Sequence, residues 1–332
     1  MTDGALGIGI IGAGWWGGQH ARAIARAEGV RLVAACRGDG GVEDFVAAHG
    51  GTAHRSVEGV LADRAVDAVV VATPHHLHEA HAIAAARAGK HILLEKPMAP
   101  GTAACSRIIA AARATGVVLV LGHSLRFAAP LAAAKAWLDG GEFGAVRFAR
   151  GAMIKLWMEA NRRPWHLEPA SGGGLLLTAG IHTLDAVLWL VGAPVRDVHA
   201  VVATGFHPMR VDDLAQLTLR FEGGAIGSVT SVGYRDGAPS GGIDLVCERG
   251  TIAIDPGRGV RLGQAAKWRD LPMALPADVP GQALVEEWRA FARAVRGEAA
   301  PAVDGEAGRR VVACIEAAFE SARRGVTVEV AP

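Results

Sequence analysis

The feature that most restricts how this chain can fold is a set of three glycines near its start. Gly12, Gly14 and Gly17 form the pattern G-x-G-x-x-G. The pattern directly follows an apolar run, Leu6–Ile11, that is typical of a buried strand, and it opens a segment of helical periodicity, Trp16–Glu28. In this setting the first glycine permits a tight turn, the second lets the backbone approach a pyrophosphate, and the third allows helix and strand to pack closely. Because free amides at a helix start bind phosphate, we predict a dinucleotide site here rather than a purely structural turn.

The residue after the second predicted strand, Arg31–Cys36, indicates which dinucleotide is bound. NAD sites carry an acidic residue about 20 positions beyond the glycine loop, where it accepts hydrogen bonds from the ribose. In this chain that position is Arg37, and a guanidinium suits a 2′-phosphate. We therefore predict a preference for NADP over NAD. Two alternatives stay open: Asp39 could take the acidic role, or Arg37 could be a solvated surface residue.

The apolar pattern changes near residue 122, which predicts two domains in a chain of 332 residues. Before this point, apolar runs without polar alternation are separated by Ala-rich helical segments, as in a doubly wound parallel sheet covered by helices. Beyond it, alternating runs and glycine-containing turns indicate a mostly antiparallel sheet. We expect an α/β protein with domains at residues 1–122 and 123–332.

The predicted strands are Leu6–Ile11, Arg31–Cys36, Ala68–Ala72, His91–Leu94, Val117–Leu121, Val146–Trp157, Val195–Thr204, Asp213–Phe221, Ala225–Gly233, Ile243–Cys247, Thr251–Asp255 and Val260–Leu262. The predicted helices are Trp16–Glu28, Val42–His49, Ser56–Asp63, Leu77–Ala88, Thr102–Thr115, Phe127–Leu138, Gly180–Val191, Ala283–Arg296 and Gly305–Arg324.

Bulk composition argues against several functional classes. The 34 Lys and Arg nearly balance the 33 Asp and Glu, leaving a net charge of +1, so the chain does not resemble a strongly basic nucleic-acid binder. The four cysteines lie far apart without a C-x-x-C pair, which predicts neither a disulfide framework nor a cysteine zinc site. The chain has no unbroken apolar run of about 18 residues and its glycine-interrupted start differs from a signal peptide. We expect a cytoplasmic protein.

Lysine and tyrosine are scarce, which shortens the list of catalytic candidates. The chain has one tyrosine, Tyr234, and five lysines, of which Lys96 stands in the sequence Glu95-Lys96-Pro97 directly after a predicted strand. Doubly wound sheets bind ligands at this edge, where a lysine can donate a hydrogen bond to an alcohol oxygen. An ordinary salt-bridging lysine is the alternative. The segment Thr73-Pro74-His75-His76-Leu77-His78 follows another strand at the same edge.

These motifs resemble those of the Gfo/Idh/MocA oxidoreductases, the glucose–fructose oxidoreductase and inositol dehydrogenase relatives. The resemblance also rests on Gly122-His123 before Arg126-Phe127, and on Gly172–Gly174 before Gly180–Asp185. It implies a Rossmann domain followed by an α/β domain with an open, mostly antiparallel sheet, whose outer face often mediates oligomerisation. It further implies reversible hydride transfer between nicotinamide and a secondary alcohol, usually of a sugar or cyclic polyol.

The resemblance implies roles for individual residues. Lys96 matches the family's catalytic lysine, His182 the histidine that commonly serves as acid and base, and Asp185 a carboxylate one helical turn later. Inositol-dehydrogenase-like members have an aspartate four residues before that histidine, but here the position is Thr178. Without this carboxylate, proton transfer falls to His182, with Lys96 polarising the oxygen. A histidine that merely occupies a helix start is the alternative.

Further residues are expected to contact the substrate or the cofactor. Arg126, Trp157, Arg163 and Trp165 belong to an Arg- and Trp-rich group that could grip a polar substrate or only pack loops. Expected cofactor contacts are Gly12, Gly14, Trp15, Trp16, Gly17, Arg37, Thr73, Pro74, His75, His78, Glu95, Lys96 and Trp165. Expected substrate contacts are Lys96, Arg126, Trp157, Arg163, Thr178, His182 and Asp185.

The histidine-rich segment after residue 74 lacks a His-x-x-x-His pair, so we expect no metal. We expect a homodimer or homotetramer. Alternative functions are an imine, hemiacetal or dihydrodiol reductase or dehydrogenase of the same fold, and a non-catalytic NADP-sensing regulator.

Overall fold

The computed structural model describes residues 4–38 and 40–331 of the chain. It contains two compact units, the described residues of Met1–Ser124 with Pro280–Arg309, and those of Leu125–Val279 with Arg310–Pro332. The alternative ribose residue Asp39 lies outside the described residues.

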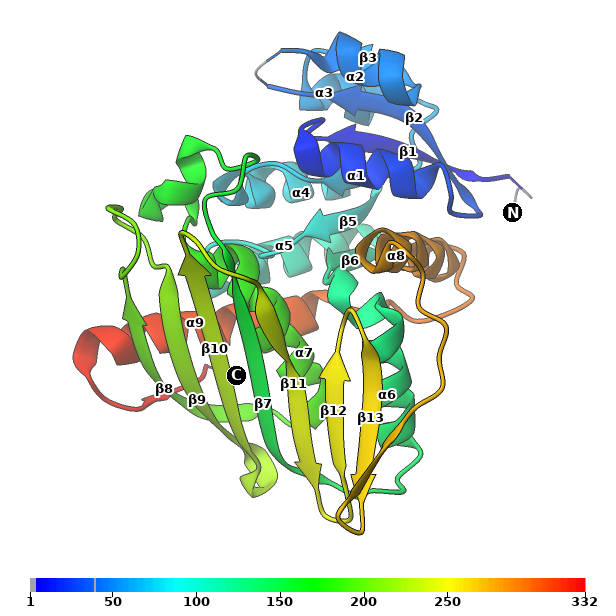
Figure 1. Cartoon of the computed structure of the whole chain (residues 1–332). Helices are drawn as coiled ribbons and strands as arrows, with labels where there is room; N and C mark the ends of the chain where they lie inside the picture. The colour runs from blue at the N-terminus through cyan, green and yellow to red at the C-terminus, as the bar shows by residue number, and fades with distance from the viewer. Residues whose placement is uncertain (1–3, 39, 332) are drawn as a thin grey trace. The chain divides into compact units, whose positions relative to one another are not determined.

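The first unit contains a parallel sheet of six strands in the order β3-β2-β1-β4-β5-β6 (Figure 1). The order reverses direction at β1, so the carboxyl ends of β1 and β4 flank a topological switch point, where such sheets bind ligands. The strands are β1 (Leu6–Ile11), β2 (Val30–Cys36), β3 (Thr52–His54), β4 (Ala68–Val71), β5 (His91–Glu95) and β6 (Leu119–Gly122). The predicted doubly wound sheet is confirmed.

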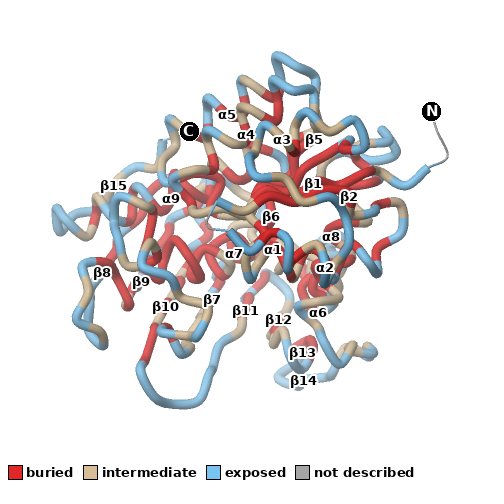
Figure 2. The backbone as a smooth tube through the Cα atoms, turned by 90° about the horizontal axis from the view of Figure 1, so that it is seen from above, coloured by how far each residue is buried: buried red, intermediate tan, exposed pale blue. Residues whose placement is uncertain are grey.

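Helices cover this sheet and bury its strands, as Figure 2 shows for the interior of the first unit. They are α1 (Trp15–Ile24), α2 (Val42–His49), α3 (Val57–Ala62), α4 (His78–Arg87) and α5 (Thr102–Thr115). The core gains a further helix from late in the chain, α8 (Val279–Val295). Leu284, Trp288 and Phe291 of α8 pack with Ile8 and Ile10 of β1 in one buried cluster. The predicted boundary at residue 122 did not include this return of the chain.

The second unit contains a nine-stranded sheet in the order β14-β13-β12-β11-β7-β10-β9-β8-β15. Neighbouring strands run antiparallel except β7 and β10, which are parallel. This confirms the expected mostly antiparallel sheet. The strands are β7 (Val146–Leu156), β8 (Val195–Ala203), β9 (Leu214–Phe221), β10 (Ile226–Tyr234), β11 (Ser240–Cys247), β12 (Thr251–Asp255), β13 (Gly259–Gln264), β14 (Lys267–Asp270) and β15 (Val328–Glu329).

The helices of this unit are α6 (Ala129–Asp139), α7 (Ile181–Val191) and α9 (Gly305–Arg324), the last from Arg310 onward. Helix α7 packs directly on β7 at Gly151, where an added Cβ would lie 2.6 Å from the Cγ2 of Thr183 and 2.9 Å from that of Val187. One turn of π-helix, Leu176–Gly180, leads into α7. Such turns occur frequently at functional sites.

Among the described residues, one helical stretch is long and apolar enough to cross a membrane. It is Pro169–Val191, with a mean hydropathy of 1.6, and 78% of its most apolar window is buried inside the protein. Although the sequence has no unbroken apolar run of this length, the averaged hydropathy of this window is high. Its burial makes it weak support for a membrane span, because a helix in a protein core has the same composition.

Candidate active site

The glycine loop has the geometry that a dinucleotide site requires. Gly12 has a φ of +106°, and an added Cβ there would lie 2.5 Å from the carbonyl oxygen of Ala72. At Gly17 a Cβ would lie 2.4 Å from the carbonyl oxygen of Gly12, so this glycine lets α1 approach β1. At Gly14 a Cβ would meet nothing within 4 Å, and among the described residues no side chain caps α1 there. Open space in front of uncapped amides fits a pyrophosphate.

Three predicted cofactor residues in or after the glycine loop, Trp15, Trp16 and Arg37, differ in the solvent exposure of their side chains. Trp15 is 54% exposed and stacks on Trp16, with ring centroids 5.5 Å apart. Trp16 in turn meets the ring of His20 edge-on. Arg37 is half-buried and directly follows β2. The predicted cofactor residues of this loop therefore lie at the carboxyl ends of β1 and β2.

His78 ties together the two segments that follow β4 and β5. Its Nδ1 lies 2.8 Å from the carbonyl oxygen of Pro97 and its Nε2 lies 2.9 Å from that of Thr73. The ring is fully buried, and this burial lowers the pKa of His78, whereas the two carbonyls and the charge of Glu95 oppose the shift. A neutral ring donates to one carbonyl at a time. Both ring nitrogens are occupied by the backbone, so the side chain braces the ligand-binding edge of the sheet.

The neighbouring residues after β4 have their own contacts. The Thr73 hydroxyl pairs with Nδ1 of His81 at 3.1 Å. Pro74 precedes a single turn of 3₁₀ helix, His75–Leu77, in which His75 is buried and its ring meets that of His78. These residues lie at the ligand-binding edge where the sequence predicted them.

The Glu-Lys-Pro motif lies at the end of β5, and its glutamate is held in place by hydrogen bonds. Glu95 is buried and lies 3.0 Å from Nε2 of His20, while its second oxygen accepts the main-chain N–H of Lys96 at 3.2 Å. Gly122 on β6 leaves room for this carboxylate, because a Cβ there would lie 2.7 Å from its Oε1. Burial alone would raise the pKa of Glu95, but His20, the charge of Lys96 and the Trp16 indole together lower it. Glu95 is therefore an ionised carboxylate beside the half-buried Lys96.

In the second unit, two predicted substrate residues are paired with each other. The Arg126 guanidinium contacts Asp185 through both carboxylate oxygens, at 2.9 Å from Nε and 2.5 Å from Nη2. The pair is almost completely buried. This bidentate pair fixes α7 to the 3₁₀ turn Ser124–Phe127.

His182 and Thr178 lie around the junction between the π-helical turn and α7. Thr178 is buried within the turn, and His182 is half-buried in the first turn of α7. The start of the turn is held by Asp212, which accepts the Leu176 N–H at 2.7 Å. Burial raises the pKa of Asp212 to about 6. The sequence did not point to Asp212, although its place directly before an alternating strand was visible.

The Arg- and Trp-rich group is divided between core and surface. Trp157 is fully buried in a small cluster with Leu175 and Ala179, and the Arg162 guanidinium stacks on its ring at 4.2 Å. This burial favours the packing alternative for Trp157. Arg163 is exposed, and Trp165 stacks on His166 with centroids 3.6 Å apart.

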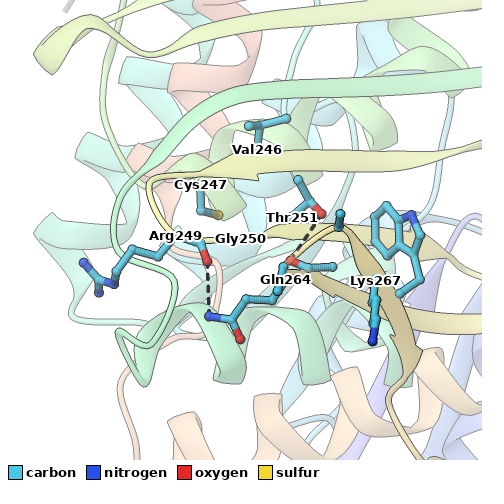
Figure 3. Close-up of a pocket in the computed structure, with 11 residues that line it drawn as sticks. Val246, Cys247, Arg249, Gly250, Thr251, Gln264 and Lys267 are labelled. Carbon is cyan, nitrogen blue, oxygen red and sulfur yellow. Dashed lines mark hydrogen bonds between the residues drawn. The ribbon is translucent and has the colours of Figure 1, made fainter.

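A pocket of about 400 Å³ lies elsewhere in the second unit, at the hairpin end of β11–β14. Figure 3 shows its lining, which includes Thr251, Gln264 and Lys267 but none of the predicted site residues. The pocket is open to solvent, and we assign it no function. Within residues 4–38 and 40–331, no group of three or more His, Cys, Asp or Glu side chains is arranged to hold a metal ion.

The parallel sheet and its glycine loop define a dinucleotide-binding fold, and comparison with known proteins identifies the family. Residues 6–123 match the family model for the oxidoreductase family with an NAD-binding Rossmann fold, and residues 131–253 match the GFO/IDH/MocA C-terminal domain. The chain belongs to the Gfo/Idh/MocA family, as its motifs predicted. It is therefore an NAD(P)-dependent oxidoreductase of a family that acts on alcohols, including sugars, inositols and a dihydrodiol.

Three similar proteins illustrate the range of this family. Inositol 2-dehydrogenase 2 of Saccharopolyspora erythraea is 33% identical over 76% of this chain and 74% of its own length. The 1-carboxy-3-chloro-3,4-dihydroxycyclo hexa-1,5-diene dehydrogenase of Comamonas testosteroni is 34% identical over 58% of this chain, but the match spans only 47% of that protein. The WlbA dehydrogenase of Bordetella pertussis, solved with NADH and UDP-GlcNAcA, is 27% identical with a TM-score of 0.84 over 100% of this chain and 99% of its own.

Proposed function

We propose that this protein transfers hydride between a nicotinamide cofactor and a secondary alcohol or ketone of a sugar, cyclic polyol or related ring compound. The observation that carries the proposal is the uncapped glycine loop at Gly14, with Lys96 held at the same sheet edge beside an ionised Glu95. The names of its relatives support a ring-shaped substrate.

The proposed reaction transfers one proton and one hydride. In the oxidising direction a nicotinamide cofactor held at the glycine loop of Gly12, Gly14 and Gly17 would supply the acceptor for the hydride of the carbinol carbon. The hydroxyl proton passes to His182 as a carbon–oxygen double bond forms, and the Lys96 ammonium donates a hydrogen bond to that oxygen. Arg126 and Asp185 neutralise each other, so we propose that they support α7 and hence the position of His182.

This assignment is tested with Lys96→Ala and His182→Ala. Each should lower kcat by about 10²–10⁴-fold, the range of a lost acid–base group, while the Kd for cofactor changes little. Substrates are found by following reduced nicotinamide across sugars, inositols, other polyols and dihydrodiols. Near-normal turnover of the His182 variant would remove that residue from the chemistry.

For the cofactor we propose NADP, because Arg37 occupies the position of the ribose-binding acid. The ratio of kcat/KM for the two cofactors decides this, and a clear preference for NAD would contradict it. A dihydrodiol dehydrogenase is the second candidate function, favoured by the relative from Comamonas testosteroni. Cofactor binding without turnover of any alcohol, ketone, imine or hemiacetal would favour a sensing role.

We further propose a homodimer or homotetramer that forms through the outer face of the nine-stranded sheet. Ile226, Phe148 and Val246 are paired across β10, β7 and β11 and are all exposed, which is typical of an association surface. Phe148→Arg should shift the sedimentation coefficient to that of a monomer. Phe319→Arg on α9, where the phenylalanine is equally exposed at 37%, is the matched control. We expect the enzyme to work in the reducing cytoplasm, with its four cysteines as buried thiols.

A further inference from the structure

Three buried side chains from three elements of the first unit form a hydrogen-bonded line. The indole Nε1 of Trp288 on α8 donates to Nδ1 of His20 on α1 at 3.1 Å. The other ring nitrogen of His20, Nε2, lies 3.0 Å from Oε1 of Glu95 at the end of β5. Trp288 and His20 are fully buried and Glu95 is nearly so. The line ends at Lys96, whose main-chain N–H is bound by the second oxygen of Glu95.

The chemistry of the indole selects the tautomer of His20. An indole N–H only donates, so the nitrogen that it faces must be an acceptor without a proton. In the neutral imidazole the single proton then lies on Nε2, from which it is donated to Glu95. An imidazolium would place a second N–H against the indole N–H in this fully buried site. Trp288 therefore favours the neutral Nε2–H tautomer.

The tautomer of His20 affects Lys96 because both residues face the charge of Glu95. Its carboxylate faces His20 and Trp16 from α1 and Lys96 from its own strand end, and it also interacts with His78 on α4.

Glu287 on α8 is the remaining titratable group that interacts with Glu95. Burial and the charge of Glu95 raise the pKa of Glu287 well above its usual range, so this acid adds no charge near neutral pH. With His20 also neutral, Lys96 supplies the positive charge that compensates Glu95.

We propose that Trp288 and His20 are positioning residues for Lys96: the indole holds His20 as its neutral Nε2–H tautomer, so that Glu95 keeps a fixed orientation and a negative charge that Lys96, rather than His20, balances. A carboxylate close to an ammonium favours the charged form of the latter. The role of Lys96 rests on the proposed function, whereas the tautomer of His20 does not.

The first test reads the tautomer directly and needs no turnover. Nitrogen NMR of protein labelled at its 13 histidines should show the His20 ring in the neutral Nε2–H form between about pH 5.5 and 8.5, the range in which histidines ordinarily titrate. The signal is assigned to His20 by its absence from His20→Gln. Trp288→Phe keeps most of the ring volume but removes the donor, so His20 should then take up a proton as the pH falls. An Nδ1–H tautomer or an imidazolium in the unaltered protein would overturn the proposal.

The second test separates charge from packing. Glutamine at position 20 can donate to Glu95 and accept from Trp288 but cannot be protonated, so His20→Gln should keep kcat within about twofold and leave the pH profile unchanged. Trp288→Phe should lower kcat about tenfold at low pH, at the lower end of losses seen when outer hydrogen-bond partners are removed, with little change in cofactor Kd. The double variant should regain the lost activity at low pH.

Persistence of the low-pH loss in the double variant would refute the charge argument. If no variant and no parent protein turns over any substrate, the proposed function fails while the NMR result still decides the tautomer.

Discussion

Glu287→Gln should stabilise this protein, and the gain should depend on pH in a defined way. The Glu287 side chain is fully buried on α8, and neither of its carboxyl oxygens has a hydrogen-bond partner among the described residues. Burial and the neighbouring charge of Glu95 raise the pKa of Glu287 well above its usual range. Folding near neutral pH therefore requires this carboxyl to take up a proton that the unfolded chain releases.

The size of the effect follows from the pH at which unfolding is measured. An unfolded glutamate titrates at about 4.3, and each pH unit above this corresponds to about 1.36 kcal/mol for a group that stays protonated in the folded state. The upper limit at pH 7 is therefore about 4 kcal/mol. Because the folded pKa lies above the unfolded one, this penalty is absent below about pH 4.3 and grows as the pH rises toward the folded pKa. Glutamine has nearly the same shape and never ionises, so it removes the penalty.

Denaturant unfolding of the two proteins at several pH values measures this difference. The free energy of unfolding of Glu287→Gln should exceed that of the parent by about 2–4 kcal/mol at pH 7, and the gap should narrow by about 1.36 kcal/mol per pH unit on acidification. Glu298→Gln, at an exposed position shortly after α8, is the matched control and should change nothing. A Glu287 variant that is no more stable than the parent at pH 7, or a gap independent of pH, would refute the reasoning.

Four other variants have outcomes that follow from the structure. Gly14→Ala should leave the thermal unfolding midpoint unchanged, because its Cβ meets no atom within 4 Å, yet should weaken cofactor binding at least about tenfold by filling the space for the pyrophosphate. Gly17→Ala should instead lower the midpoint, since its Cβ would lie 2.4 Å from a carbonyl oxygen of the loop. Arg37→Ser should reduce kcat/KM for NADP by about 10–100-fold, as expected for a lost charged hydrogen bond of about 1.5–3 kcal/mol. The kcat/KM for NAD should stay unchanged. Equal losses with both cofactors would contradict the proposed 2′-phosphate contact. Ala265→Asn with Ala266→Gly should raise the free energy of unfolding by about 1–2 kcal/mol in denaturant titrations, because both alanines have positive φ, 49° and 60°.

Much of the fold could be predicted from the sequence where the periodicity was strong. The buried parallel strands and the alternating strands of the second sheet have patterns that few other structures share. Three strands were not predicted because they lack such patterns: Thr52–His54 has three residues, Val328–Glu329 has two, and Lys267–Asp270 is exposed throughout. A helix was expected over Ala283–Arg296 and is found over Val279–Val295. Its membership in the first unit was not expected, since helical periodicity identifies an apolar face but not the surface that it covers.

Only the site residues that stand in sequence motifs could be predicted. The glycine loop and Glu95-Lys96 stand in recognisable patterns, whereas His20 and Trp288 are 268 positions apart and act through a contact that no local pattern encodes. Glu287 did leave a signal, because it interrupts the apolar face formed by Leu284 and Phe291. An acidic residue in such a stripe indicates a buried carboxyl, although its partner cannot be read from the sequence.

The return of α8 to the first unit has a consequence for how the protein is made. Trp288 and Phe291 belong to the buried cluster around β1, but between Ser124 and Pro280 the ribosome must first produce the 155 residues of Leu125–Val279. At about 5–20 residues per second this takes roughly 8–30 s. During that interval the nascent nucleotide-binding sheet exposes the apolar surface that α8 later covers. Most of the second unit, Leu125–Val279, is thus made before the first unit closes, whereas its last part, from Arg310 onward, is made afterwards. Chaperones can act on the exposed apolar surface during this interval.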